Sequence, residues 1–209
     1  WHNRGYRDFA DFLDLMQSRK RKQLKRERRL VLEQGLQLRA LRGTEVDAAL
    51  WDRFHHFYQL TYARRSGHGG YLNRAFFRLL GQSMPERLLL VVAEHRREVV
   101  AGALYVIGAD TLYGRYWGCT EDYAQLHFET CYYQGIDFCI REGFARFDAG
   151  AQGEHKLARG FEPVLTHSCH LIAHPGFRAA IDDFLLRERD AIESYRREAA
   201  AALPYRDAV

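Results

Sequence analysis

The sequence predicts a mixed α/β fold of the α+β type, and three observations carry this prediction. Residues 88–118 have the pattern of three successive strands joined by short polar turns. An amphipathic helix, residues 123–141, separates these strands from a further short apolar strand, residues 144–149. Amphipathic helices also precede the first strand and close the chain. A run of meandering strands between helices is typical of a sheet that helices cover.

The chain begins with a predicted helix over residues 6–34. Apolar residues recur there at helical spacing, and Gly35 supplies a stop. These apolar residues are Phe9, Phe12, Leu13 and Met16, continued more thinly by Leu24, Leu30 and Val31.

The second half of this helix is strongly basic, with eight Lys or Arg residues and one acid in residues 19–29. Helical spacing aligns four of them along one stripe whose length suits contact with several phosphates. We therefore expect binding of a polyanion such as tRNA. The alternative is a solvated face of a helix that docks through Leu24 and Val31. The stripe consists of Arg19, Lys22, Arg26 and Arg29.

A strand and two helices follow. Apolar and polar residues alternate in residues 36–43, which predicts a short strand. Thr44 offers a cap for an amphipathic helix, residues 46–62, and a second helix, residues 71–80, follows the glycine-rich break at residues 67–70.

The three central strands differ in pattern. Residues 88–93 form a continuous apolar run, typical of a strand covered on both faces, and residues 99–107 return as a hairpin. Residues 111–118 form the third strand, in which Gly114 indicates a bulge or a close backbone contact.

The last quarter of the chain is predicted to contain helices and a strand in alternation. After the strand at residues 144–149 we expect a helical turn at 157–159, a strand at 164–173 and a closing helix at 177–202.

Composition narrows the class of protein. The 209 residues are 47% hydrophobic and 28% charged with a net charge of +4, which excludes a disordered chain and fits one main domain. No apolar run approaches the roughly 18 residues of a membrane helix, and no signal-like segment is present, so we expect a cytoplasmic protein. Because the chain begins with Trp1, we expect it to be the C-terminal part of a longer two-domain protein.

Metal-ligand spacing is absent from the sequence. The four cysteines form no CxxC pair, and we expect them to be reduced and buried. His127 and Glu129 are two residues apart on a helix, and His167 and His170 point to opposite faces of a predicted strand, so neither pair predicts a metal site.

The candidate catalytic residues follow the strand at residues 144–149. Two glycines in residues 150–156 allow a sharp turn and close approach to a ligand. Glu154, His155 and Lys156 then supply a carboxylate, an imidazole and an ammonium, which suit proton transfer and oxyanion stabilisation. The alternative is that Glu154 and Lys156 pair with each other or face water.

Candidate substrate contacts lie mainly on the strand at residues 111–118. Alternation predicts that Tyr113, Arg115 and Trp117 share one face. Arg115 needs a partner there, because an unpaired buried guanidinium is costly, and an internal ion pair with Glu129 or Asp148 is favoured over a substrate anion. Glu129 and Gln152 complete the predicted substrate-binding group.

The order of elements in residues 36–173 resembles the GNAT superfamily of acyltransferases. Four local motifs are more specifically similar to the bacterial Fem-like predicted N-acyltransferases. Fem aminoacyltransferases carry two such domains, and the resemblance covers only the second. The motifs are residues 18–22, 112–118, 126–129, and 150–156 with Arg159, Gly160 and Phe161.

This resemblance implies a function, a site and a domain division. It implies a basic helical segment at residues 1–34, a GNAT-like domain at residues 35–209, and transfer of an acyl or aminoacyl group onto an amine, with a peptidoglycan precursor as one acceptor. Lys156 matches the family's Lys that binds or polarises the donor, and His155 replaces the aromatic residue that usually precedes it. The donor is acyl-CoA or aminoacyl-tRNA. Glu121 and Asp122 stand where the GNAT loop binds a diphosphate, which disfavours acetyl-CoA.

Two other functions stay open. One is a noncatalytic tRNA-binding or polyanion-binding module that uses the acyltransferase fold as a scaffold. The other is an acetyl-CoA-dependent N-acetyltransferase that acts on small amines.

Overall fold

The computed structural model describes residues 1–151 and 153–206. The chain divides into two compact units. The first unit is Trp1–Gln152 and the second is Gly153–Val209. Each unit is described by itself below. The predicted division into a basic segment, residues 1–34, and a domain, residues 35–209, stays a prediction.

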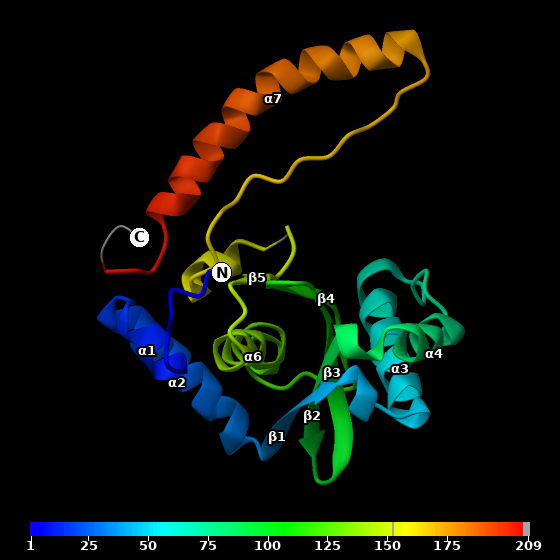
Figure 1. Cartoon of the computed structure of the whole chain (residues 1–209), viewed down its shortest axis with the longest axis vertical. Coiled ribbons are helices and arrows are strands. Elements are labelled where there is room, and N and C mark those ends of the chain that lie inside the picture. The colour runs from blue at the N-terminus through cyan, green and yellow to red at the C-terminus, as the bar shows by residue number, and fades with distance from the viewer. Residues whose placement is uncertain (152, 207–209) are drawn as a thin grey trace. The chain divides into compact units, whose positions relative to one another are not determined.

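A five-stranded mixed sheet organises the first unit, in the order β1-β2-β3-β4-β5 (Figure 1). The first four strands pair antiparallel as a meander, and β5 runs parallel to β4. This arrangement confirms the predicted fold class. The strands are β1 Leu36–Arg42, β2 Leu88–His95, β3 Glu98–Ile107, β4 Thr111–Cys119 and β5 Arg146–Asp148.

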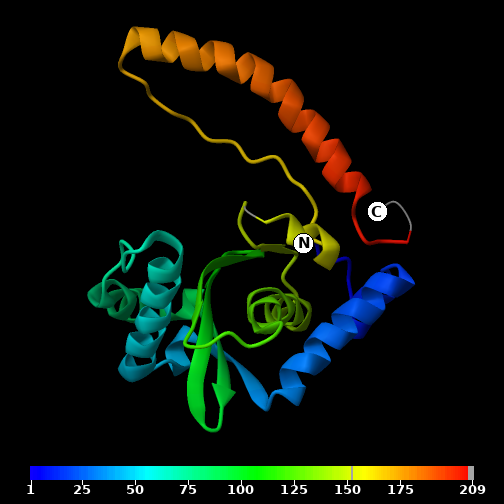
Figure 2. The ribbon, with the colours of Figure 1, turned by 180° about the vertical axis from the view of Figure 1, so that it is seen from behind.

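Helices cover both faces of this sheet (Figure 2). On one face lie α3, Ala48–Ser66, and α4, Arg74–Ser83, whose aromatic rings pack on β2, β3 and β4. On the other face lie α2, Ser18–Glu33, and α6, Gln134–Glu142. Because β2 is buried on both sides, its continuous apolar run is explained. Two short 3-10 turns, η1 Gly43–Glu45 and η2 Pro85–Arg87, connect the elements.

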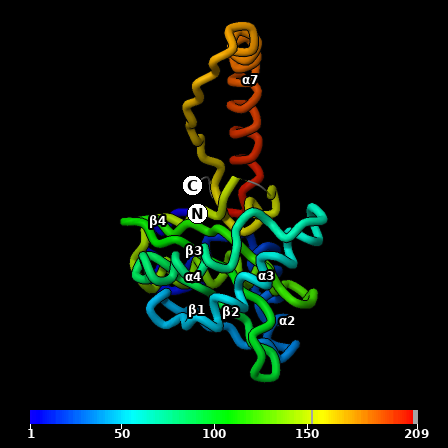
Figure 3. Tube along the Cα trace, turned by 90° about the vertical axis from the view of Figure 1, so that its right-hand side faces the viewer, coloured from blue at the N-terminus to red at the C-terminus, as the bar shows by residue number. Residues whose placement is uncertain are grey.

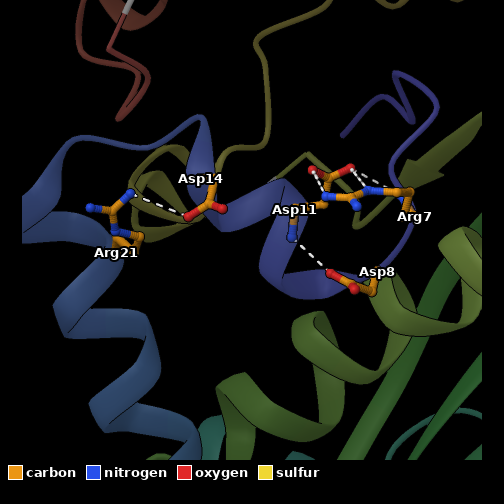
Figure 4. Close-up of polar contacts among 5 residues, drawn as sticks. All are labelled: Arg7, Asp8, Asp11, Asp14 and Arg21. Atoms are coloured by element: carbon orange, nitrogen blue, oxygen red, sulfur yellow. Dashed lines mark hydrogen bonds and ion pairs between the residues drawn. The ribbon is translucent and has the colours of Figure 1, made fainter.

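The prediction of one helix over residues 6–34 is wrong, because the structure has two. Helix α1, Phe9–Asp14, is capped by the Asp8 carboxylate, which accepts a hydrogen bond from the Asp11 backbone N–H at 2.8 Å (Figure 4). The helix ends before Met16, whose side chain is fully buried, and α2 begins at Ser18. An ion pair of 3.3 Å between Asp14 and Arg21 joins the two helices.

The predicted helix over residues 123–141 contains a π-helical turn. Helix α5, Leu126–Phe128, leads into the π turn η3, Glu129–Tyr133, which continues as α6. The wider turn re-aims the side chains at both of its ends. Glu129 and Tyr133 consequently both reach α2.

The second unit begins with the 3-10 turn η4, Glu154–Arg159, and ends with α7, Pro175–Ala201 (Figure 3). The strand predicted at residues 164–173 is wrong: these residues have no regular structure. Their sequence suits a strand, but a strand requires a partner, and none of the described residues pairs with them. Val164 and Leu171 are 64% and 91% exposed as a result. The Tyr205 hydroxyl donates to the Gly160 carbonyl at 2.7 Å and closes the unit.

The turn between β2 and β3 generates a testable prediction about stability. Arg96 and Arg97 both have positive φ, 51° and 68°, a conformation that side chains with a Cβ resist. Glycine adopts it freely, so Arg97→Gly should raise the free energy of unfolding by about 1 kcal/mol in urea titrations.

Lys25→Gly is the matched control, because Lys25 is also exposed but lies inside α2. It should lower the free energy of unfolding by about 1 kcal/mol. A loss of stability in Arg97→Gly would show that the turn is not strained.

Candidate active site

The pairing between β4 and β5 is short. It joins Thr111–Leu112–Tyr113 to Arg146–Phe147–Asp148, while β4 continues to Cys119. The Gly150 backbone N–H then donates to the Asp148 carboxylate at 2.7 Å. The ladder between β4 and β5 therefore ends at Tyr113 and Asp148.

Gly114 stands where the two strands separate. A Cβ at this position would lie 3.5 Å from the Phe147 ring and 3.6 Å from the Ala149 Cα, which are ordinary van der Waals contacts, so the approach of β5 does not require a glycine. The predicted bulge is confirmed. Tyr105 of β3 faces Gly114 and Leu104 faces Tyr116, which leaves Arg115 as the extra residue.

The bulge overturns the prediction that Tyr113, Arg115 and Trp117 share one face. Directly opposed residues of antiparallel strands lie on the same face. Tyr113 is opposite Val106, which belongs to the face that α3 and α4 cover, whereas Trp117 is opposite Ala103 on the other face. The Trp117 ring accordingly packs against His127 of α5, with 5.4 Å between ring centroids.

The internal ion pair predicted for Arg115 is also wrong. Arg115 is exposed, and no carboxylate among the described residues forms an ion pair with it. Glu129 is instead buried and accepts two hydrogen bonds from Arg28, at 3.1 and 2.9 Å. An exposed guanidinium at a bulge is available to a substrate anion, which was the other alternative.

Arg28 joins α2 to two carboxylates at once. Besides Glu129, it contacts Asp137 at 2.7 Å. Burial opposes the charge of Arg28, but the two carboxylates outweigh burial and raise its pKa above the ordinary value. Burial raises the pKa of Asp137, against the opposing effect of Arg28. Because the Glu129 carboxylate is buried and paired, it lies in the core and not on an open surface.

The predicted catalytic residues all lie in η4 of the second unit. Glu154 and His155 are exposed and Lys156 is half-buried, while Gln152 lies outside the described residues. The Tyr195 hydroxyl of α7 donates to the Glu154 carboxylate at 3.3 Å, and this charge raises the pKa of Tyr195. Arg159 donates to the His155 carbonyl at 2.9 Å.

His155 has the electrostatics of a proton acceptor. Partial burial lowers the pKa of its imidazole below 6.5, and the positive charges of Arg159 and Lys156 lower it further. The ring is consequently neutral near pH 7 and can accept a proton.

The basic stripe of α2 is exposed along its length. Arg19, Lys22 and Arg26 face solvent, and Arg29 forms an ion pair of 3.2 Å with Glu33 one turn away. The opposite side of the helix packs inward through Leu24 and Val31. The geometry of the stripe fits a polyanion and equally fits a docked, solvated helix.

The loop before α5 uses two of its backbone N–H donors internally, which leaves fewer of them for the diphosphate of coenzyme A. The Thr120 N–H donates to the Val100 carbonyl at 2.9 Å, and the Ala124 N–H donates to the Gln34 side chain at 2.9 Å. The Asp122 carboxylate, 95% exposed, adds negative charge beside the Arg64 guanidinium, with which it forms an ion pair of 3.5 Å. Sequence reasoning missed Gln34, which resembles any polar residue at a helix end.

Within residues 1–151 and 153–206, no group of three or more His, Cys, Asp or Glu side chains could hold a metal ion. In the same part of the chain, no helix combines the length and apolar character needed to cross a membrane.

Three comparisons place the chain among known proteins. A conserved protein of unknown function from Bacteroides thetaiotaomicron shares the fold, with 14% identity, a TM-score of 0.50, and coverage of 79% of this chain and 58% of that one. An aminoglycoside acetyltransferase from an uncultured soil metagenomic sample, solved with sisomicin, has 11% identity and a TM-score of 0.49 over 69% of this chain and 98% of its own.

A possible acetyltransferase from Clostridium difficile has 11% identity and a TM-score of 0.48 over 66% of this chain and 99% of its own. No curated protein matches the sequence significantly. The family model described as peptidoglycan biosynthesis/recognition matches residues 1–207. The chain therefore belongs to the FemAB-like family and has a GNAT-type fold, and this membership supports N-acyl transfer in general.

Proposed function

We propose that this protein transfers an acyl or aminoacyl group onto an amine of a peptidoglycan precursor. The observation that carries the proposal is the edge of β4 beyond Tyr113, next to Gly114 and the bulge at Arg115. No strand among the described residues pairs with this edge, although the Trp117 carbonyl accepts from the Thr61 hydroxyl at 2.8 Å. Unpaired backbone donors and acceptors at a sheet edge can bind an extended acyl or peptide group. Membership of a peptidoglycan family supports the choice of acceptor.

The reaction proceeds by addition and elimination. The amine nitrogen attacks the carbonyl carbon of the donor and forms a tetrahedral oxyanion, and the amine loses its proton to a base. The C–O or C–S bond to the leaving group then breaks, and the leaving group takes a proton. His155 or Glu154 accepts the first proton, and the Lys156 ammonium stabilises the oxyanion or a donor phosphate.

An aminoacyl-tRNA or another acyl donor is favoured over acetyl-CoA. The Thr120 and Ala124 amides of the loop before α5 are used internally, and the exposed carboxylate of Asp122, which Arg64 pairs at 3.5 Å, adds negative charge there. Positive charge is instead exposed on α2. The stripe of Arg19, Lys22, Arg26 and Arg29 also supports the second candidate function, a noncatalytic polyanion-binding module. Tyr113, Arg115 and Trp117 remain proposed substrate contacts.

Removal of the Lys156 ammonium should slow transfer. Lys156→Ala is expected to reduce the turnover rate by about 100-fold, because one donor to a developing oxyanion contributes that much. Transfer of a labelled aminoacyl group to a soluble muropeptide measures the rate, and circular dichroism checks the fold.

Arg187→Ala is the matched control, a cation of the same unit whose ion pair among the described residues is with Asp183 in its own helix. It should keep the full rate. An unchanged rate in Lys156→Ala would remove Lys156 from the mechanism.

A second experiment follows the pH dependence of transfer. Since the base must be neutral and the pKa of His155 is lowered from 6.5, the rate should rise with pH and reach its plateau below the pH expected for an ordinary histidine. His155→Gln should abolish this acidic limb. If the limb persists in His155→Gln, Glu154 becomes the candidate base.

The basic stripe can be tested by salt titration of tRNA binding. Each phosphate contact that is lost should reduce the slope of log affinity against log salt by roughly 0.7 to 0.9. Joint neutralisation of Arg19, Lys22 and Arg26 to Gln should therefore weaken binding and flatten the slope. Neutralisation of Arg178, Arg187 and Arg189 on α7 serves as the control. Equal binding by both triple variants would refute the polyanion site.

A further inference from the structure

Three aromatic rings, two exposed and one half-buried, cluster at the end of α3 and the loop that joins it to α4. We call Tyr62, His68 and Tyr71 the aromatic loop. The ring centroids are 5.9 Å apart for Tyr62 and His68, 5.2 Å for His68 and Tyr71, and 6.1 Å for Tyr62 and Tyr71. The Tyr71 side chain is 85% exposed.

A buried anchor holds this loop in place. The Tyr58 hydroxyl accepts hydrogen bonds from the Tyr71 and Leu72 backbone N–H groups, at 3.1 and 3.3 Å. Gly70 has φ of +85°, and a Cβ there would lie 2.5 Å from the Tyr58 ring. The exposed rings are therefore presented on a fixed backbone, which lowers the entropic cost of binding a ligand.

His68 adds a polar group to the surface. Its Nδ1 accepts a hydrogen bond from the Gly70 N–H at 3.1 Å, so the neutral ring carries its proton on Nε2. This exposed ring thus offers an N–H donor beside the Tyr71 ring.

The ring geometry limits what can bind. Centroids 5.2 to 6.1 Å apart are contact distances, so neither a cation nor a flat ring fits between them. The interplanar angles are 40°, 62° and 84°, so no two rings are parallel enough to sandwich a nucleobase. A ligand can only lie on the outer face of Tyr71. A sugar ring suits this surface, because it has an apolar C–H face and hydroxyl groups at its edge that can accept from His68.

We propose that the aromatic loop binds a sugar ring of the cell-wall glycan that carries the acceptor amine. This inference rests on the proposed function for its choice of glycan. The loop connects to β4 through packed rings, since Tyr58 contacts Tyr116 with 5.3 Å between centroids. Tyr116 follows the bulge at Arg115, so the aromatic loop belongs to the same face as one side of the open strand. The aromatic loop would then select acceptors that retain their sugar.

Binding and transfer are measured separately. Ligand-observed NMR titrations use N,N′-diacetylchitobiose, a disaccharide muropeptide and the stem peptide without sugar. Tyr71→Ala should weaken binding of both sugar-containing probes by about tenfold, the value of one aromatic stacking contact. Tyr71→Phe should stay within about twofold of the unchanged protein, since the ring face remains. Phe184→Ala, an exposed aromatic residue on α7, is the matched control and should bind normally.

The outcomes separate this inference from the proposed function. Loss of sugar binding in Tyr71→Ala, with no transfer to any acceptor by the unchanged protein, supports the aromatic loop and refutes the acyltransferase. Transfer to the stem peptide as fast as to the muropeptide overturns the sugar contact while the acyltransferase stands. Absence of sugar binding, or equal binding by Tyr71→Ala and Phe184→Ala, also overturns it. A tRNA affinity that falls in Tyr71→Ala without any sugar binding would assign the loop to nucleic acid instead.

Discussion

The short parallel contact between β4 and β5 is the constraint on which the candidate site depends. Three residue pairs hold the strands together, and Gly114 marks the point where they separate. Beyond it, the backbone groups along that edge of β4 have no strand partner among the described residues, and such groups need one. The bulge at Arg115 adds a local twist and turns an otherwise core-facing arginine outward. An extended substrate with amide groups could form the hydrogen bonds with this edge that a further strand would form.

A second set of contacts fixes the helix that follows β4. Two adjacent residues of α2 contact both ends of the π turn: Arg28 pairs with Glu129, and Glu27 accepts a hydrogen bond from the Tyr133 hydroxyl. Removing one partner from such a buried group leaves an uncompensated charge, which is far more costly than the pair is stabilising. The π turn is therefore locked to the helix that carries the basic stripe. The same helix presents structural groups on one side and exposed cations on the other.

The local hydrophobic pattern of the sequence was sufficient to predict the meander of strands. It failed where contacts with distant residues determine the local structure. Alternation and the apolar run at residues 88–93 gave the strands, because each strand pairs with its neighbour in sequence. The break between α1 and α2 depends on the burial of Met16, and the π turn depends on partners in α2, neither of which leaves a local signal. Arg115 was assigned a buried partner because alternation was assumed to continue through the bulge. Glu129 already had a partner about 100 residues away, Arg28.

The proposed acyl donor follows from the places where groups that bind anions are exposed. In the loop before α5, the Thr120 and Ala124 N–H groups already donate to Val100 and Gln34, and Asp122 places an exposed carboxylate beside Arg64, so a diphosphate would find fewer donors there. Opening this loop for coenzyme A would break the Gln34 contacts, which lie at the surface. The cations of α2 need no such rearrangement, because they are already exposed. A donor with phosphates spread over a large surface is thus favoured over a compact one, which is the physical argument for a polyanionic carrier such as tRNA.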